Sequence, residues 1–158
     1  MNWSRKKQKR KILQGNNKNT PVPANERRNY LIINAIFAGI IVIIFIYSGI
    51  ISPEKNSYPI VCIHEQITGE PCPSCGLSRS FSYIIRGDLD AAERFNEYGI
   101  RIFLFFAFHL LMRISNIVYL LRKPLYVRQL AILDSVLAII TFILAFRQFF
   151  IYYLKLLF

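Results

Sequence analysis

Residues 30–51 read YLIINAIFAGIIVIIFIYSGII, a stretch without charge in which only Asn34 and Ser48 are clearly polar. A helix of this length rises about 1.5 Å per residue and reaches about 33 Å, enough to cross the hydrocarbon core of a bilayer. No small-residue cleavage site follows, and Ser52-Pro53 takes the place of a lipid-modified cysteine. The stretch therefore predicts an uncleaved transmembrane anchor.

Two further apolar runs, residues 99–121 and 129–154, are also long enough to span a membrane. They are joined by a short basic turn, residues 122–128, in which Pro124 ends the preceding helix. A chain of 158 residues is expected to form one domain. Its hydrophobic content of 54% is concentrated in these long runs, which favours a membrane protein. The predicted fold class is an all-α integral membrane protein with three transmembrane helices.

Charge predicts the orientation of these spans. Nine of the 20 Lys and Arg residues fall in residues 1–29, which are polar and expected to form a mobile tail. The tail and the basic turn lie on one side of three spans, and the positive-inside rule places both in the cytoplasm. Residues 52–98 and the C-terminus are then outside. We expect the tail to contact anionic lipids rather than nucleic acid.

Charged side chains inside the spans predict how the second and third helices pair. Arg113 and Asp134 lie at similar distances from Pro124, so an antiparallel pair brings them to the same depth as an ion pair. Each belongs to a polar stripe, one with Arg101, His109 and Asn116, the other with Thr141 and Gln148. The stripes indicate either a seam that fixes helix pairing or a proton path through His109, and the seam is favoured. Arg147 is expected to reach lipid headgroups.

The outer segment, residues 52–98, predicts two short helices. Apolar residues recur at helical spacing over 77–86, Gly87 ends that helix, and Asp88 caps a second one over 89–96. Together they predict a helical hairpin at the outer membrane interface, between spans one and two.

All three cysteines of the chain lie in this outer segment. Cys72-x-x-Cys75 has the spacing of a metal knuckle, and Cys62 with His64 would complete a Cys₃His set for structural zinc. A disulfide is the second possibility, because the outer face is oxidising. Redox catalysis through Cys72 and Cys75 is the third, since a nearby helix N-terminus lowers a thiol pKa.

Arg79 follows in the first turn of the short helix, where free backbone N–H groups favour an anion. A lipid phosphate or a substrate carboxylate would suit it. A purely structural partner, such as Glu70, Asp88 or Glu93, would suit it equally well.

The sequence CPSCGLSRSF at residues 72–81, RGDLDAA at 86–92 and then Phe95-Asn96 resembles a family of small bacterial membrane proteins, domain-of-unknown-function family 2752. The resemblance covers about residues 60–120. Ser78 stands where Thr is commoner, and Glu97 where Pro often follows the Asn. It implies a bacterial cytoplasmic-membrane protein with a cysteine-bearing hairpin and no established reaction. It raises these positions for testing: Cys72, Cys75, Gly76, Arg79, Gly87, Asp88 and Asn96.

These observations predict an accessory protein more than an enzyme. The hairpin, stapled by metal or disulfide, would dock an unknown protein partner or a second copy of the chain. The alternative is a membrane enzyme that exchanges disulfides through Cys72 and Cys75, or a transferase whose Arg79 holds an anionic lipid. A subunit of an oligomeric transporter is a third class, because three spans are few for a path.

Overall fold

The computed structural model describes residues 24–54, 66–67, 69, 72–123 and 127–157, and within them the only regular structure is helical. Three helices are long and apolar enough to cross a membrane: α2 (Ala24–Ile50), α6 (Gly99–Arg122) and α7 (Val127–Leu157). Two short helices, α4 (Leu77–Ile85) and α5 (Leu89–Phe95), lie between α2 and α6 in the chain. The predicted all-α fold with three membrane-spanning helices is confirmed.

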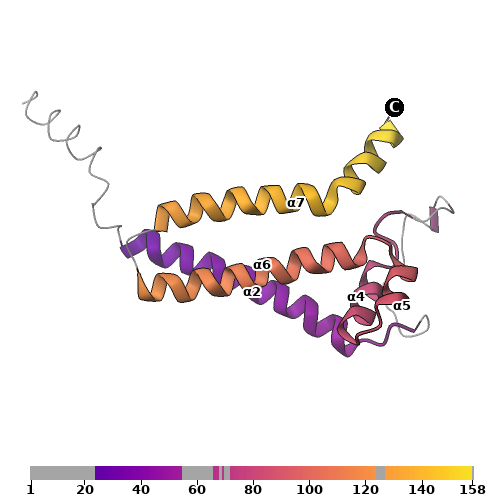
Figure 1. Cartoon of the computed structure of the whole chain (residues 1–158), viewed down its shortest axis with the longest axis horizontal. Helices are drawn as coiled ribbons and strands as arrows, with labels where there is room; N and C mark the ends of the chain where they lie inside the picture. The colour runs from indigo at the N-terminus through magenta and orange to yellow at the C-terminus, as the bar shows by residue number, and fades with distance from the viewer. Residues whose placement is uncertain (1–23, 55–65, 68, 70–71, 124–126, 158) are drawn as a thin grey trace, which may run out of the picture.

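Helices α2 and α6 pack against each other and cross, and α4 and α5 pack against one end of this pair (Figure 1). Phe81 of α4 is buried there against Phe103 and Phe106 of α6, with ring centroids 5.3 and 6.1 Å apart. Helix α7 runs beside α6, and its C-terminal end bends away (Figure 1). The end of the α2–α6 pair that carries α4 and α5 is called the hairpin end below.

The hairpin is joined to the end of α2 by hydrogen bonds to carbonyl groups that the helix itself leaves unpaired. Arg86 donates to the carbonyl oxygens of Ser48, Gly49 and Ile51 at 3.0 to 3.3 Å. The Ser82 hydroxyl donates to the Ser48 carbonyl at 2.6 Å. The positive charge of Arg86 also suits the negative end of the helix dipole. These two residues therefore act as the C-terminal cap of α2.

The turn between α4 and α5 follows its sequence. Gly87 has a φ of +83°, a conformation that favours glycine, and it ends the first helix. The Asp88 side chain accepts a hydrogen bond from the Ala91 N–H at 2.9 Å, as expected of an N-cap. Both predicted turn residues are confirmed in their local roles.

The helix that contains the first predicted span begins before that span. Helix α2 starts at Ala24, so residues 24–29, which we assigned to the polar tail, are helical. Tertiary contacts explain the extension: Arg128 of α7 pairs with Glu26 at 3.0 Å, and Arg27 donates to the Leu120 carbonyl near the end of α6 at 3.1 Å. Helix α7 likewise extends beyond the predicted 129–154 at both ends.

Candidate functional site

The two cysteines of the Cys-x-x-Cys motif lie side by side in a tight turn just before α4. The Cys75 N–H donates to the Cys72 carbonyl at 2.9 Å, and the Cys72 N–H points back to the Cys75 sulfur at 3.2 Å. The two Sγ atoms are 3.3 Å apart, and the Ser74 hydroxyl lies 3.0 Å from the Cys72 sulfur. Cys72 is buried, whereas Cys75 is partly exposed.

Asn96 fixes this turn from the far end of the hairpin. Its side-chain amide donates to the carbonyl oxygens of Pro73 and Cys75 at 2.8 and 2.9 Å, and its carbonyl oxygen accepts from the Tyr98 N–H. Because Asn96 is itself buried, it holds both ends of the turn in a fixed position relative to the start of α6.

Gly76, directly after the second cysteine, is required by both conformation and space. Its φ is +74°, which a residue with a Cβ adopts only at a cost. A Cβ at this position would also collide with the backbone carbonyl of Phe95. Similarly, a Cβ on Gly99 would collide with the buried hydroxyl of Ser80. The cysteine turn therefore packs backbone to backbone against the end of α5, and the Ser80 side chain of α4 packs directly on the backbone at the start of α6.

The geometry of the two sulfurs suits bridging chemistry. A separation of 3.3 Å is longer than the disulfide bond length of about 2.05 Å, but small shifts would either close the bond or open a tetrahedral edge around one metal ion. Cys62 and His64, the other predicted zinc ligands, lie outside the described residues. Within the described part of the chain, no group of three His, Cys, Asp or Glu residues is arranged to hold a metal.

Arg79 lies on the first turn of α4, as predicted, with its guanidinium 5.7 Å from the centre of the Phe95 ring. The same ring stacks on Tyr83 at 5.1 Å. One function of Arg79 is therefore to cover the aromatic contact between α4 and α5.

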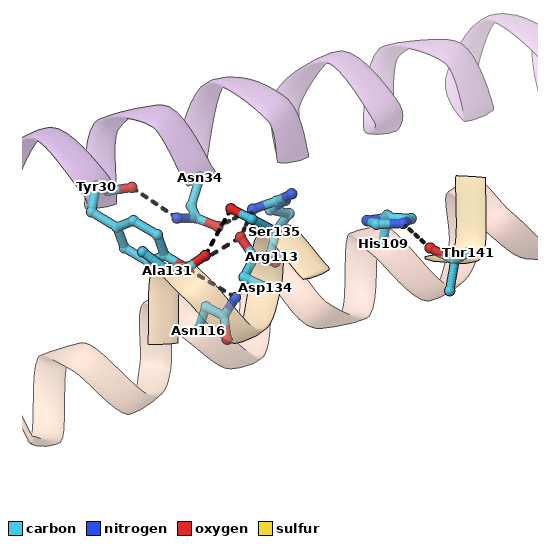
Figure 2. Close-up of polar contacts among 9 residues, drawn as sticks. All are labelled: Tyr30, Asn34, His109, Arg113, Asn116, Ala131, Asp134, Ser135 and Thr141. Atoms are coloured by element: carbon cyan, nitrogen blue, oxygen red, sulfur yellow. Dashed lines mark hydrogen bonds and ion pairs between the residues drawn. The ribbon is translucent and has the colours of Figure 1, made fainter. Parts of the chain in front are cut away.

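A second polar site lies within the spans and joins all three of them (Figure 2). Arg113 of α6 forms an ion pair with Asp134 of α7, and its Nη1 also donates to the Asn34 side chain of α2 at 3.0 Å. The Tyr30 hydroxyl of α2 donates to Asp134 at 3.2 Å and accepts from Asn116 at 3.3 Å. We call these five residues the intramembrane cluster.

Further along the spans, His109 Nε2 lies 2.9 Å from Thr141 Oγ1 (Figure 2). Thr141 places its own hydroxyl proton on the Leu137 carbonyl at 2.7 Å, so the imidazole is the donor to Thr141. This arrangement supports a structural seam, because the threonine proton is already engaged within its own helix.

Three residues of these sites were not identified as site residues from the sequence. Tyr30 and Asn34, spaced four apart on α2, complete the intramembrane cluster, and Arg86 caps α2. The four-residue spacing of polar groups in an otherwise apolar span was an available signal. Arg86 had none, since the carbonyl groups that it caps at the end of α2 lie 35 or more residues earlier in the chain.

Residues 62–110 match the model of one protein family, described as "Protein of unknown function (DUF2752)". Residues 62–110 are thus similar to this family. The resemblance inferred from the cysteine motif is thereby confirmed, while a search of curated proteins and of solved structures found no match.

The DUF2752 match begins at Cys62, includes the cysteine turn with the whole α4–α5 hairpin, and ends at Leu110 in α6. It leaves out α2, α7 and the ion pair of Arg113 with Asp134. The part of this chain that carries the DUF2752 sequence is thus the hairpin with its attachment to α6.

Proposed function

We propose that this protein is a non-catalytic accessory protein of the cell membrane, whose hairpin is a rigid platform that docks a protein partner on the outer side. In this orientation the N-terminus is cytoplasmic and the C-terminus is outside. The basic residues of the N-terminal tail contact anionic lipids on the cytoplasmic side.

The observation that carries this proposal is that the cysteine turn is held on both sides while Cys72 is buried. Asn96 occupies two carbonyl groups of the turn, and Gly76 packs on the Phe95 backbone. Buried cysteines in fixed positions are typical of structural roles, whereas a reactive thiol has to be reached by its substrate. The caps at Arg86 and Ser82 transmit this rigidity to α2.

The proposal includes a staple that joins the preceding segment to the turn, either a zinc ion held by Cys62, His64, Cys72 and Cys75 or a disulfide from Cys62. Metal content and free thiols, measured on the detergent-purified protein, separate the two forms. One zinc per chain supports the metal staple, and a disulfide that links Cys62 to Cys72 or Cys75, without metal, supports the covalent staple. Three free thiols without metal would contradict both.

Docking is tested with a photo-crosslinking amino acid at Leu89, which is 52% exposed on the hairpin. The expected result is one crosslinked product in intact cells, which disappears when Asn96→Ala loosens the platform. The same amino acid at Leu121, 62% exposed on the opposite end of α6, is the matched control. Equal products from both sites, unaffected by Asn96→Ala, would contradict the proposal.

An enzymatic function remains the second candidate because of one contact: the Cys72 N–H directed at the Cys75 sulfur would stabilise a thiolate. In that case Cys75→Ser leaves the fold intact and abolishes mixed disulfides with substrate proteins. If the cysteines are structural, the same change lowers thermal stability instead. A transferase that holds an anionic lipid through Arg79 would lose lipid binding in Arg79→Ala, and unchanged binding would reject it.

A further inference from the structure

A groove of about 450 Å³ lies between α6 and α7, and it is lined by two arginines and several apolar side chains. Arg101 of α6 and Arg147 of α7 are its charged residues, and both are exposed. Leu104 and Leu144, each 60% exposed, and the ring of Phe105 form much of its apolar lining. Neither the cysteine turn nor the intramembrane cluster contributes to it.

The groove lies toward the hairpin end of the spans. Arg101 is two residues after the start of α6, and its guanidinium is 5.8 Å from the centre of the Tyr98 ring. The Tyr98 ring also contacts Phe149 of α7 at 6.4 Å, close to Arg147 in sequence. Tyrosines are enriched where a membrane meets water, so the two arginines lie at the level expected for lipid headgroups.

Within the described part of the chain, no acidic side chain neutralises the charge of this site. Among the described residues, neither Arg101 nor Arg147 forms an ion pair. Glu97, the acidic residue adjacent to Tyr98, is instead hydrogen-bonded to that phenol and raises its pKa. Two arginines thus line one largely apolar groove, and none of the described carboxylates pairs with either of them.

We propose that this groove binds an anionic phospholipid in the leaflet at the hairpin end. The phosphate lies between Arg101 and Arg147, whose planar guanidinium groups match phosphate oxygens. An acyl chain follows the apolar lining along Leu104, Phe105 and Leu144 toward the bilayer centre. A protein is a less suitable ligand for this groove than a lipid. The two positive charges lie at the level of the headgroups, where the bilayer itself supplies anionic phosphates.

Titration of the detergent-purified full-length protein with dioleoylphosphatidylglycerol and with dioleoylphosphatidylcholine, followed by native mass spectrometry, tests the proposal. The expected result is preferential binding of phosphatidylglycerol. Each arginine contributes about 5-fold, so Arg101→Gln and Arg147→Gln each weaken binding by that factor and the double variant by about 30-fold. Arg122→Gln, an exposed charge at the opposite end of α6, is the control and leaves binding unchanged.

A second variant distinguishes a lipid from a free anion. Leu144→Trp fills the groove and keeps both arginines, and it weakens lipid binding by about 4-fold for each methylene group that it displaces. Inorganic phosphate should not compete at concentrations comparable to the lipid. The thermal midpoint of each variant, measured without added lipid, shows whether its fold is intact. If an arginine variant does not fold, Lys at both positions replaces it and keeps the charge.

Three results would overturn the proposal. The double arginine variant binds phosphatidylglycerol as Arg122→Gln does, or phosphatidylcholine binds as tightly as phosphatidylglycerol. In the third, phosphate displaces the lipid fully while Leu144→Trp has no effect, which would assign the arginines to a free anion.

Discussion

Helix α7 and the α2–α6 pair have similarly apolar sequences, yet they are held in different ways. The pair is covered at the hairpin end, where Arg86, Ser82 and Phe81 fix α4 to both helices. Helix α7 buries only Val127, Asp134 and Ala145 among its described side chains. Since lipid tails are as apolar as Leu or Ile, apolar composition alone does not bring helices together in a bilayer. Close backbone contact and polar groups do, and α7 is held to α6 by the ion pair of Asp134 together with ring contacts of Phe142 and Phe146 on Phe105.

The largest loss of stability should come from breaking the ion pair that attaches α7 to α6. Asp134→Leu leaves the Arg113 charge buried without its carboxylate partner, and we expect a loss of about 3 kcal/mol with release of α7. Thermal unfolding in detergent and hydrogen exchange of the α7 amides measure this. The double variant Arg113→Leu/Asp134→Leu should recover most of the loss, because an apolar pair carries no unpaired charge. Wild-type stability of Asp134→Leu would show that the pair does not hold α7.

The hairpin should respond to a change that leaves α7 in place. Gly76→Ala imposes a positive φ on a residue with a Cβ and drives that atom into the Phe95 carbonyl, so we expect a loss of about 2 kcal/mol. Hydrogen exchange should increase in α4 and α5 but not in α7. Gly39→Ala is the control, since a Cβ there meets nothing within 4 Å. Equal exchange in both variants would mean that the cysteine turn tolerates a side chain.

The cap of α2 tests whether the hairpin stabilises the spans. Arg86→Gln removes charged hydrogen bonds to the end of α2. Because Arg86 is exposed, we expect the free energy of unfolding to fall by only about 1 kcal/mol. The change is measured as a lower thermal midpoint and faster exchange at Ser48 to Ile50. Arg94→Gln, which removes another exposed charge from the hairpin, should have no effect. If both variants behave alike, net charge rather than capping explains the result.

The smallest loss of stability is expected from the contact of Thr141 in α7 with His109 in α6. Thr141→Val keeps the shape of the side chain and removes the acceptor for His109, at a cost of about 0.6 kcal/mol. Ser135→Ala serves as the comparison, because that hydroxyl bonds only to its own helix at the Ala131 carbonyl. A loss for Thr141→Val that approaches that of Asp134→Leu would mean that α7 is held along its whole length.

Much of this fold follows from local sequence. The three spans follow from the lengths of their apolar runs, and the turn at Gly87 and Asp88 from residue preferences. The contact of Arg113 with Asp134 could be counted outward from Pro124, because a short turn fixes the register of the two helices it joins. The thiol pair in the cysteine turn follows equally from a spacing of three residues.

The rest depends on contacts across long sequence separations. The segment between α2 and α6 is too long to fix their register, so nothing local places Tyr30 and Asn34 beside Asp134 and Arg113. The early start of α2 has the same origin, since the partners of Glu26 and Arg27 lie in α7 and α6. The groove at Arg101 and Arg147 exists only because α7 lies beside α6 at that level.

The arginine caps also bear on the order of synthesis. Helix α2 leaves the ribosome first, but the carbonyl groups at its end receive Arg86 only after the hairpin has been made. Conversely, Arg27 near the start of α2 finds its acceptor, the Leu120 carbonyl, only when α6 is complete. When α2 is made, the carbonyl groups at its C-terminal end and the Arg27 side chain near its N-terminal end therefore still lack their later hydrogen-bond partners. We expect α2 expressed alone to be recognised by membrane proteases as an orphan segment, and co-expression of residues 52–158 as a separate chain to protect it.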